Sequence, residues 1–192
     1  MAIEMTKICK SFGEKQVLNG ITLTLTPGEI TCLMGESGIG KTTLINIIAG
    51  LIKPDSGSIR GLDDKKISIV FQEDRLLEWE TALTNVLFVA NLKNTAIELL
   101  TLAGLSDSLN KKAAELSGGM KRRVSVCRAL MVDFDLLILD EPFKGLDSTT
   151  KPVIIDMVKK YLQKDKYILC VTHDLHEVEM LGGRLVTLNE TN

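Results

Sequence analysis

The sequence has few aromatic residues: one Trp, two Tyr and five Phe make up 4% of its 192 positions. Single-stranded nucleic acids are commonly bound by stacking their bases on aromatic side chains, and this chain offers little for that purpose. Its 23 Lys and Arg are balanced by 25 Asp and Glu, which gives a formal net charge of −2. Such a balance creates no general attraction to nucleic acid or to an anionic membrane. We therefore expect no nucleic-acid partner.

Long apolar runs are also missing from the sequence. The densest apolar stretch, residues 44–52, is interrupted by Asn46 and Gly50, whereas a membrane-spanning helix needs about 20 mostly apolar residues. The first residues lack the unbroken apolar core of a secretory signal. We expect a chain that does not cross a bilayer by itself.

Cysteines are few and scattered. The chain has four of them, without a C-x-x-C pair or a neighbouring histidine cluster: Cys9, Cys32, Cys127 and Cys170. Disulfides or a metal site are the alternatives, but this spacing favours buried free thiols in a reducing compartment. The cysteines thus predict a cytosolic protein.

The rest of the composition is that of a soluble globular protein, with 45% apolar and 25% charged residues. A length of 192 residues suggests one domain over residues 1–192. Apolar periodicity predicts the secondary structure. Strands are expected over residues 21–25, 30–34, 67–71, 136–139, 167–171 and 184–188, and helices over residues 41–51, from after Ser117 to Leu130, 148–163 and 175–181.

Strands that alternate with helices predict an α/β fold with a mainly parallel sheet covered on both faces. Residues 81–116 differ, because their apolar residues have helical spacing and no strand pattern interrupts them. We expect a small helical lobe there. The core would then consist of about residues 1–80 and 117–192.

A glycine-rich loop lies between the expected strand 30–34 and the expected helix 41–51. It fits the pattern G-x-x-x-x-G-K-[ST] and consists of Gly35, Glu36, Ser37, Gly38, Ile39, Gly40, Lys41 and Thr42. In such a loop the backbone N–H groups and the helix N-terminus surround phosphate oxygens. Lys41 can reach the β- and γ-phosphates, and the Thr42 hydroxyl can ligate Mg²⁺. A plain connecting turn is the alternative, but the strand–loop–helix setting favours nucleotide binding.

Two carboxylates follow the apolar strand 136–139. Asp140 and Glu141 would lie at the carboxyl end of this strand, where open α/β sheets bind ligands. Asp140 is suited to holding Mg²⁺ through water, and Glu141 to polarising an attacking water. Solvated acids at a strand end are the alternative. The phosphate loop makes the functional interpretation the better one.

A third motif, Leu116-Ser117-Gly118-Gly119-Met120, begins a helix. By itself it could be a helix cap with Ser117 as the capping residue. Its position between the phosphate loop and the carboxylates, however, resembles the LSGG signature of the ATP-binding subunits of ABC transporters. Other motifs of that family match in order: Gln72 after a strand, Asp147 in Gly145-Leu146-Asp147, and His173 in Val171-Thr172-His173-Asp174.

This resemblance covers essentially the whole chain and implies a P-loop NTPase core, a small N-terminal antiparallel β part and a short α-helical lobe. It implies that two such subunits face each other head to tail with ATP and Mg²⁺ between them. Gly35 to Thr43 would hold the phosphates of one nucleotide, while Ser117, Gly118 and Gly119 of the opposite subunit close over its γ-phosphate.

The resemblance also implies roles for single residues. Asp147 would lie at the dimer seam, and Phe12 would stack on adenine, with core packing as its alternative. Gln72 would sense the γ-phosphate or Mg²⁺. His173 would contact the γ-phosphate and orient the water for which Glu141 is the base.

The segment Phe71 to Val86 looks most like importer ATPases for nitrate, sulfonates, taurine and pyrimidine precursors. By that resemblance the chain would power import of a small anion or organic solute through a separate permease at the cytoplasmic face of the membrane. A second ATPase subunit, identical or different, and an extracytoplasmic solute-binding protein would be its other partners. Residues 73–81 would line the permease groove, with Leu76, Leu77 and Trp79 as candidate anchors. The alternatives are that Leu76 and Leu77 are core residues and that Trp79 packs against the helical lobe.

Two other functions are alternatives to this one. A soluble ABC ATPase of DNA repair or translation would carry a coiled-coil insertion or a second phosphate loop, and the sequence has neither. A phosphate-loop kinase would not need the LSGG motif or His173. Both motifs favour the transporter ATPase.

Overall fold

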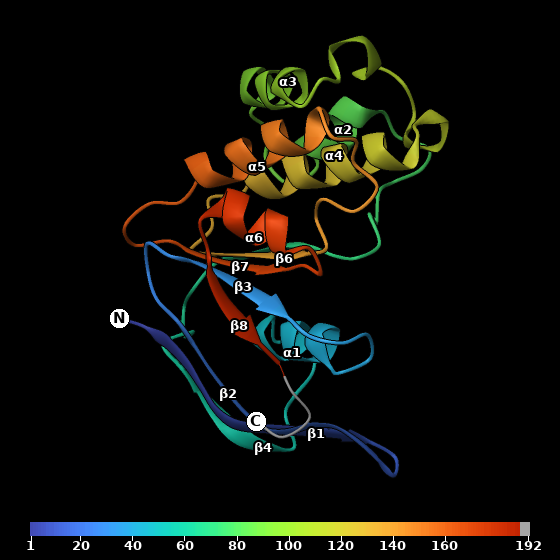
Figure 1. Ribbon diagram of the computed structural model, residues 1–192. Helices are drawn as coiled ribbons and strands as arrows, with labels where there is room; N and C mark the ends of the chain where they lie inside the picture. Colours follow the sequence, from blue (N-terminus) through green and yellow to red (C-terminus); the bar gives the residue numbers. More distant parts are fainter. Residues whose placement is uncertain (189–192) are drawn as a thin grey trace.

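A parallel sheet of five strands runs through the centre of the molecule in the order β5-β6-β7-β3-β8. The computed structural model describes residues 1–188 (Figure 1). The sheet strands are β3 (Ile30–Met34), β5 (Ile67–Val70), β6 (Leu136–Asp140), β7 (Tyr167–Val171) and β8 (Arg184–Thr187).

The middle strands are largely apolar because both faces of the sheet are covered. Successive side chains of a strand point to opposite faces, and β6 follows this rule. Leu136 and Ile138 belong to one apolar cluster, whereas Leu137 and Leu139 belong to another on the opposite face. Asp140, which ends the strand, is buried as well.

One face of the central sheet is covered by α1 (Lys41–Ile48) and by a second, antiparallel sheet in the order β2-β1-β4 (Figure 1). Its strands are β1 (Ile3–Phe12), β2 (Lys15–Leu25) and β4 (Ser56–Arg60). Met5, Leu23, Leu44 and Ile138 lie in the same buried cluster. Helix α1 is therefore fixed between the two sheets.

The other face carries the remaining helices. These are α4 (Gly118–Leu130), α5 (Thr150–Lys160) and α6 (Leu175–Leu181), with α2 (Ala82–Leu87) and α3 (Lys93–Leu102) beyond them (Figure 1). Two short 3₁₀ turns, Ser106–Ser108 and Ala113–Glu115, complete this region. Val86, Leu100 and Val124 share one buried cluster with the sheet residue Leu137, so residues 81–116 pack directly on α4.

The α/β fold predicted from the sequence is confirmed, although several boundaries differ. The helices expected over residues 41–51 and 148–163 are shorter, because α1 ends at Ile48 and α5 spans Thr150–Lys160. Strand β1 was not predicted residue by residue. Its apolar alternation breaks at Lys7, which has a positive φ of 52° beside a shift in register between Met5 and Ile8. Residues 189–192 lie outside the described residues.

The four cysteines are free thiols, as expected, but Cys9 is only half-buried. Burial raises the pKa of Cys32 to about 11 and that of Cys127 to about 12, so both stay protonated at neutral pH. None of the helices within residues 1–188 is long and apolar enough to span a membrane.

A buried asparagine fixes the segment that leads into α2. Asn85 is fully buried, and its side-chain oxygen accepts a hydrogen bond from Leu77 N at 2.8 Å. Its amide nitrogen donates to Leu77 O at 3.1 Å and to Thr81 O at 3.0 Å. Buried backbone groups need such partners. One side chain therefore ties the loop to the helix.

Replacing Asn85 by Ala should lower the free energy of unfolding by about 2 kcal/mol, because it removes the buried amide and leaves the Leu77 N–H without its partner. Urea unfolding of Asn85→Ala measures this loss. The exposed Asn94 on α3 provides the control, and Asn94→Ala should unfold like the wild type. Equal stability of the two variants would contradict the role given to Asn85.

Candidate functional site

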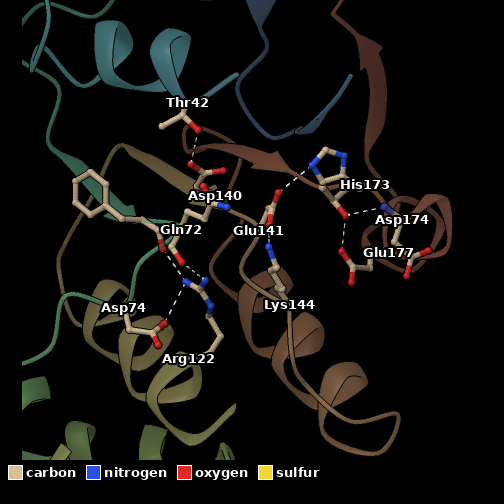
Figure 2. Close-up of polar contacts among 12 residues, drawn as sticks. Thr42, Gln72, Asp74, Arg122, Asp140, Glu141, Lys144, His173, Asp174 and Glu177 are labelled. Carbon is tan, nitrogen blue, oxygen red and sulfur yellow. Dashed lines mark hydrogen bonds and ion pairs between the residues drawn. The ribbon is translucent and has the colours of Figure 1, made fainter. Parts of the chain in front are cut away.

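The carboxyl ends of β3, β6 and β7 lie side by side, because these strands are parallel neighbours in the sheet. Each is followed by one of the groups singled out in the sequence: the glycine-rich loop after β3, Asp140 and Glu141 at the end of β6, and His173 after β7. Figure 2 shows Thr42, Asp140, Glu141 and His173 at this edge. The sheet thus gathers residues that are far apart in the sequence.

The glycine-rich loop depends on glycine at specific positions. Gly38 and Gly40 have positive φ angles of 83° and 108°, which L side chains rarely adopt. A Cβ at Gly40 would lie 2.6 Å from the Leu18 side chain and 2.9 Å from Val17 O. Gly40 is also the N-cap of α1. Because glycine has no side chain to cap the helix, the N–H groups of the first turn of α1 are left to bind an anion.

Lys41 folds back into this loop. Its Nζ donates to Gly35 O at 2.7 Å and to Glu36 O at 2.8 Å. Burial lowers the pKa of Lys41, and the charges of Glu141 and Asp140 oppose that shift. The ammonium group therefore lies against two carbonyl oxygens of the loop and within electrostatic reach of both carboxylates.

Thr42 and Asp140 form a pair of oxygen donors. The Thr42 hydroxyl donates to Asp140 Oδ2 at 3.2 Å, and only 3% of Asp140 is exposed. Burial raises the pKa of Asp140, the Thr42 hydrogen bond lowers it, and neighbouring Glu141 raises it further. A hydroxyl beside a carboxylate is a donor set that suits Mg²⁺ when phosphate oxygens and water supply the other ligands. Residues 1–188 contain no cluster of three or more acidic, His or Cys side chains able to hold a metal alone.

Glu141 is held from two sides (Figure 2). Its Oε1 lies 2.8 Å from His173 Nε2, and its Oε2 accepts from Lys144 Nζ at 2.9 Å. Its φ of 50° is unusual for a residue with a side chain. Burial raises the pKa of Glu141, but hydrogen bonds and charges of Lys144 and His173 outweigh burial and lower it. Glu141 is therefore an ionised carboxylate in contact with an imidazole.

The loop that carries His173 is braced by residues the sequence analysis did not single out. Buried Glu177 accepts a hydrogen bond from the Thr172 hydroxyl and from Lys151 Nζ at 2.6 Å. Lys151 also contacts Asp174 Oδ2 at 3.4 Å. This brace connects α5 and α6 on either side of His173.

Gln72 follows β5 and is exposed, and its backbone is held by α4. Buried Arg122 donates to Phe71 O at 2.6 Å and to Gln72 O. Arg122 also pairs with Asp74 at 3.3 Å (Figure 2). No sequence pattern predicts this contact, because its partners are 51 and 50 positions away.

The signature residues and Asp147 do not join this group within one chain. Ser117 is the N-cap of α4, and its Oγ accepts from Met120 N at 3.3 Å. Asp147 accepts hydrogen bonds from Thr149 and Thr150 at the start of α5. A cavity of about 330 Å³ beside the carboxylates is lined by Ser37, Gln72, Glu141, Lys144, Thr172, His173, Asp174 and Glu177, and neither the signature residues nor Asp147 are among them.

Phe12, the residue expected to stack on adenine, is half exposed at the end of β1. Lys10 Nζ lies 5.6 Å from its ring centroid. A cavity of about 410 Å³ beside the glycine-rich loop is lined by residues 15–17, 19, 21 and 36–39, and Phe12 is not part of its lining. The ring is accessible from solvent, so core packing does not explain it.

Residues 73–81 expose fewer apolar side chains than expected. Leu76 is partly buried against the main apolar cluster, and the Leu77 backbone is bound to Asn85. Trp79, in contrast, is 69% exposed. Of the three anchors expected there, Trp79 alone has the exposure of a surface contact, and Leu76 contributes to the fold.

The comparisons with known proteins agree with this arrangement. Residues 18–144 match the family model described as ABC transporter. The chain belongs to the ABC transporter family. It is 38% identical, over 97% of its length and 69% of the relative, to the aliphatic sulfonates import ATP-binding protein SsuB 2 of Pseudomonas syringae. It is also 38% identical, over 92% of its length and 69% of the relative, to the bicarbonate transport ATP-binding protein CmpD of Synechococcus elongatus.

Solved structures of ABC transporter ATPases have the same fold. A dimeric structure of MJ0796, described as a bacterial ABC transporter cassette, matches with a TM-score of 0.87 and 32% identity, over 98% of this chain and 94% of that one. A post-hydrolysis state of MJ0796 bound to ADP and Pi matches with a TM-score of 0.85 and 30% identity. The predicted P-loop NTPase core and ATPase activity of an ABC transporter subunit are confirmed.

Proposed function

We propose that the chain binds ATP with Mg²⁺ at the loop Gly35–Thr43 and hydrolyses it with Glu141 as the general base. The observation that carries this proposal is the contact between Glu141 and His173, whose Oε1 and Nε2 atoms lie 2.8 Å apart. This contact lies at the sheet edge where the glycine-rich loop follows β3. A base, its orienting partner and a phosphate-binding loop thus share one place. They are the parts that phosphoryl transfer to water requires.

In this proposal, the loop N–H groups and Lys41 hold the β- and γ-phosphates, and Phe12 stacks on adenine. Thr42, Asp140 and Gln72 would hold Mg²⁺, which when bound neutralises phosphate charge. Glu141 accepts a proton from the attacking water, whose oxygen bonds to the γ-phosphorus as the bond to ADP breaks. His173 contacts the γ-phosphate and keeps the water in line.

The site would be completed by a second ATPase subunit, identical or different. Ser117, Gly118 and Gly119 lie outside the cavity beside Glu141, and their place at the N-terminus of α4 suits them to the γ-phosphate of an opposing chain. Asp147 would lie at the seam. This supports a composite site formed by two chains.

The names of the relatives indicate the class of solute that is transported. Their names concern import of aliphatic sulfonates and bicarbonate transport. We infer that the chain powers import of a small anion or organic solute through a separate permease, at the cytoplasmic face of the membrane. An extracytoplasmic solute-binding protein would deliver the solute.

ATP hydrolysis by the purified chain tests the assignment of the base. Glu141→Gln should slow hydrolysis by about 100-fold or more, the usual contribution of general base catalysis, while ATP still binds. Lys41→Ala should weaken ATP binding by about tenfold to a hundredfold, because a charge-assisted hydrogen bond is lost.

Exposed residues of the same type serve as controls for these variants. Glu98→Gln on α3 and Lys53→Ala after α1 should hydrolyse and bind ATP like the wild type, since both side chains are exposed. Wild-type hydrolysis by Glu141→Gln would show that Glu141 is not the base.

Mixed dimers test the composite site. Ser117→Arg and Lys41→Ala should each be inactive, and mixing them should restore part of the activity. One site of the mixed dimer then carries both defects and the other carries none. Mixing Lys41→Ala with Glu141→Gln should restore nothing, because each site keeps one defect. Equal outcomes for the two mixtures would exclude a site formed by two chains.

Trp79 tests the permease surface. Trp79→Ala should weaken capture of the cognate permease, because exposed aromatic residues often dominate binding energy, and leave basal hydrolysis unchanged. Leu51→Ala is the matched control, since Leu51 is 59% exposed but follows α1. Permease capture at the wild-type level by Trp79→Ala would remove this residue from the interface.

A further inference from the structure

Lys144 lies three residues after Glu141 and is not explained by the functions assigned so far. Its Nζ donates to Glu141 Oε2 at 2.9 Å, while His173 Nε2 lies 2.8 Å from Glu141 Oε1. Each oxygen of one carboxylate therefore has its own partner (Figure 2). Lys144 also lines the 330 Å³ cavity that Gln72 and His173 share.

The contact is poorly explained as a source of stability. The side chain of Lys144 is 64% exposed, whereas that of Glu141 is 14% exposed. An ion pair with one such exposed partner contributes little to folding, because water screens it and the long side chain loses entropy. The main effect of this ion pair is to orient the Glu141 carboxylate.

The negative charge around Glu141 also favours a cation at the position of Lys144. The buried carboxylate of Asp140 directly precedes Glu141, and like charges so close repel each other. Lys41 acts on both carboxylates from the loop side. Lys144 lies on the β6–α5 connection and supplies the cation that faces Glu141 from there.

We propose that Lys144 is a positioning residue that, together with His173, fixes the Glu141 carboxylate in the orientation used to accept the proton of water. This inference rests on the proposed role of Glu141 as the base. In this role Lys144 acts on the reaction through Glu141 rather than by binding the nucleotide. Two hydrogen bonds on opposite oxygens restrict rotation of the carboxylate, and one alone leaves it free to turn.

The test uses Lys144→Met, which keeps a long apolar stem and removes the ammonium group. It should lower kcat about tenfold, the usual effect of losing one charge-assisted hydrogen bond, with unchanged KM and unchanged affinity for ATP. Lys144→Arg should restore most of the rate. Lys160→Met, which changes an exposed lysine of α5, should behave like the wild type, as should the urea stability of all three variants.

A double variant separates this role from direct contact with ATP. In the Glu141→Gln background, Lys144→Met should slow hydrolysis no further, because the group it orients is already gone. Additional slowing there, or a wild-type or raised kcat for Lys144→Met alone, would overturn the inference. A slow Glu141→Gln beside a wild-type Lys144→Met overturns this inference alone, whereas wild-type hydrolysis by Glu141→Gln overturns the proposed base and this inference with it.

Discussion

Parallel pairing of β6, β7 and β3 is the constraint on which the rest of the structure depends. Leu139 pairs with Cys170, and Cys32 pairs with Cys170 from the other side, which places three strand ends in one row. The phosphate loop, the two carboxylates and His173 each begin where a strand ends. A slip of one register position would move every inward side chain to the other face and separate these groups.

Charge is the second organising feature of the site. Asp140 and Glu141 lie in a region that excludes much of the solvent, and burial raises the pKa of Asp140. Cations from three directions compensate: Lys41 from the loop, Lys144 from the connection to α5, and Arg122 from α4. Arg122 also donates a hydrogen bond to the backbone carbonyl of Gln72. This bond connects α4, which begins with the signature motif, to the loop that follows β5.

The sequence was most informative where a local pattern determines the structure. The apolar run of β6 and the glycine spacing before Lys41 predicted a strand and a loop, and the structure has both. Contacts that depend on tertiary packing could not be predicted in this way. Arg122 donates a hydrogen bond to Phe71 O, 51 residues away in the sequence. Lys7 breaks the alternation of β1 with a positive φ. Leu76 packs against the main apolar cluster, although its segment was expected to face a partner.

In the proposed dimer each chain supplies two parts of a site, one at the sheet edge and one at the start of α4. The most direct test is the specific ATPase activity as a function of protein concentration, with the oligomeric state followed by light scattering. If the site needs two chains, activity per chain rises with concentration as dimers form, while ATP binding per chain stays constant. Constant activity per chain over a range in which the protein remains monomeric would contradict it.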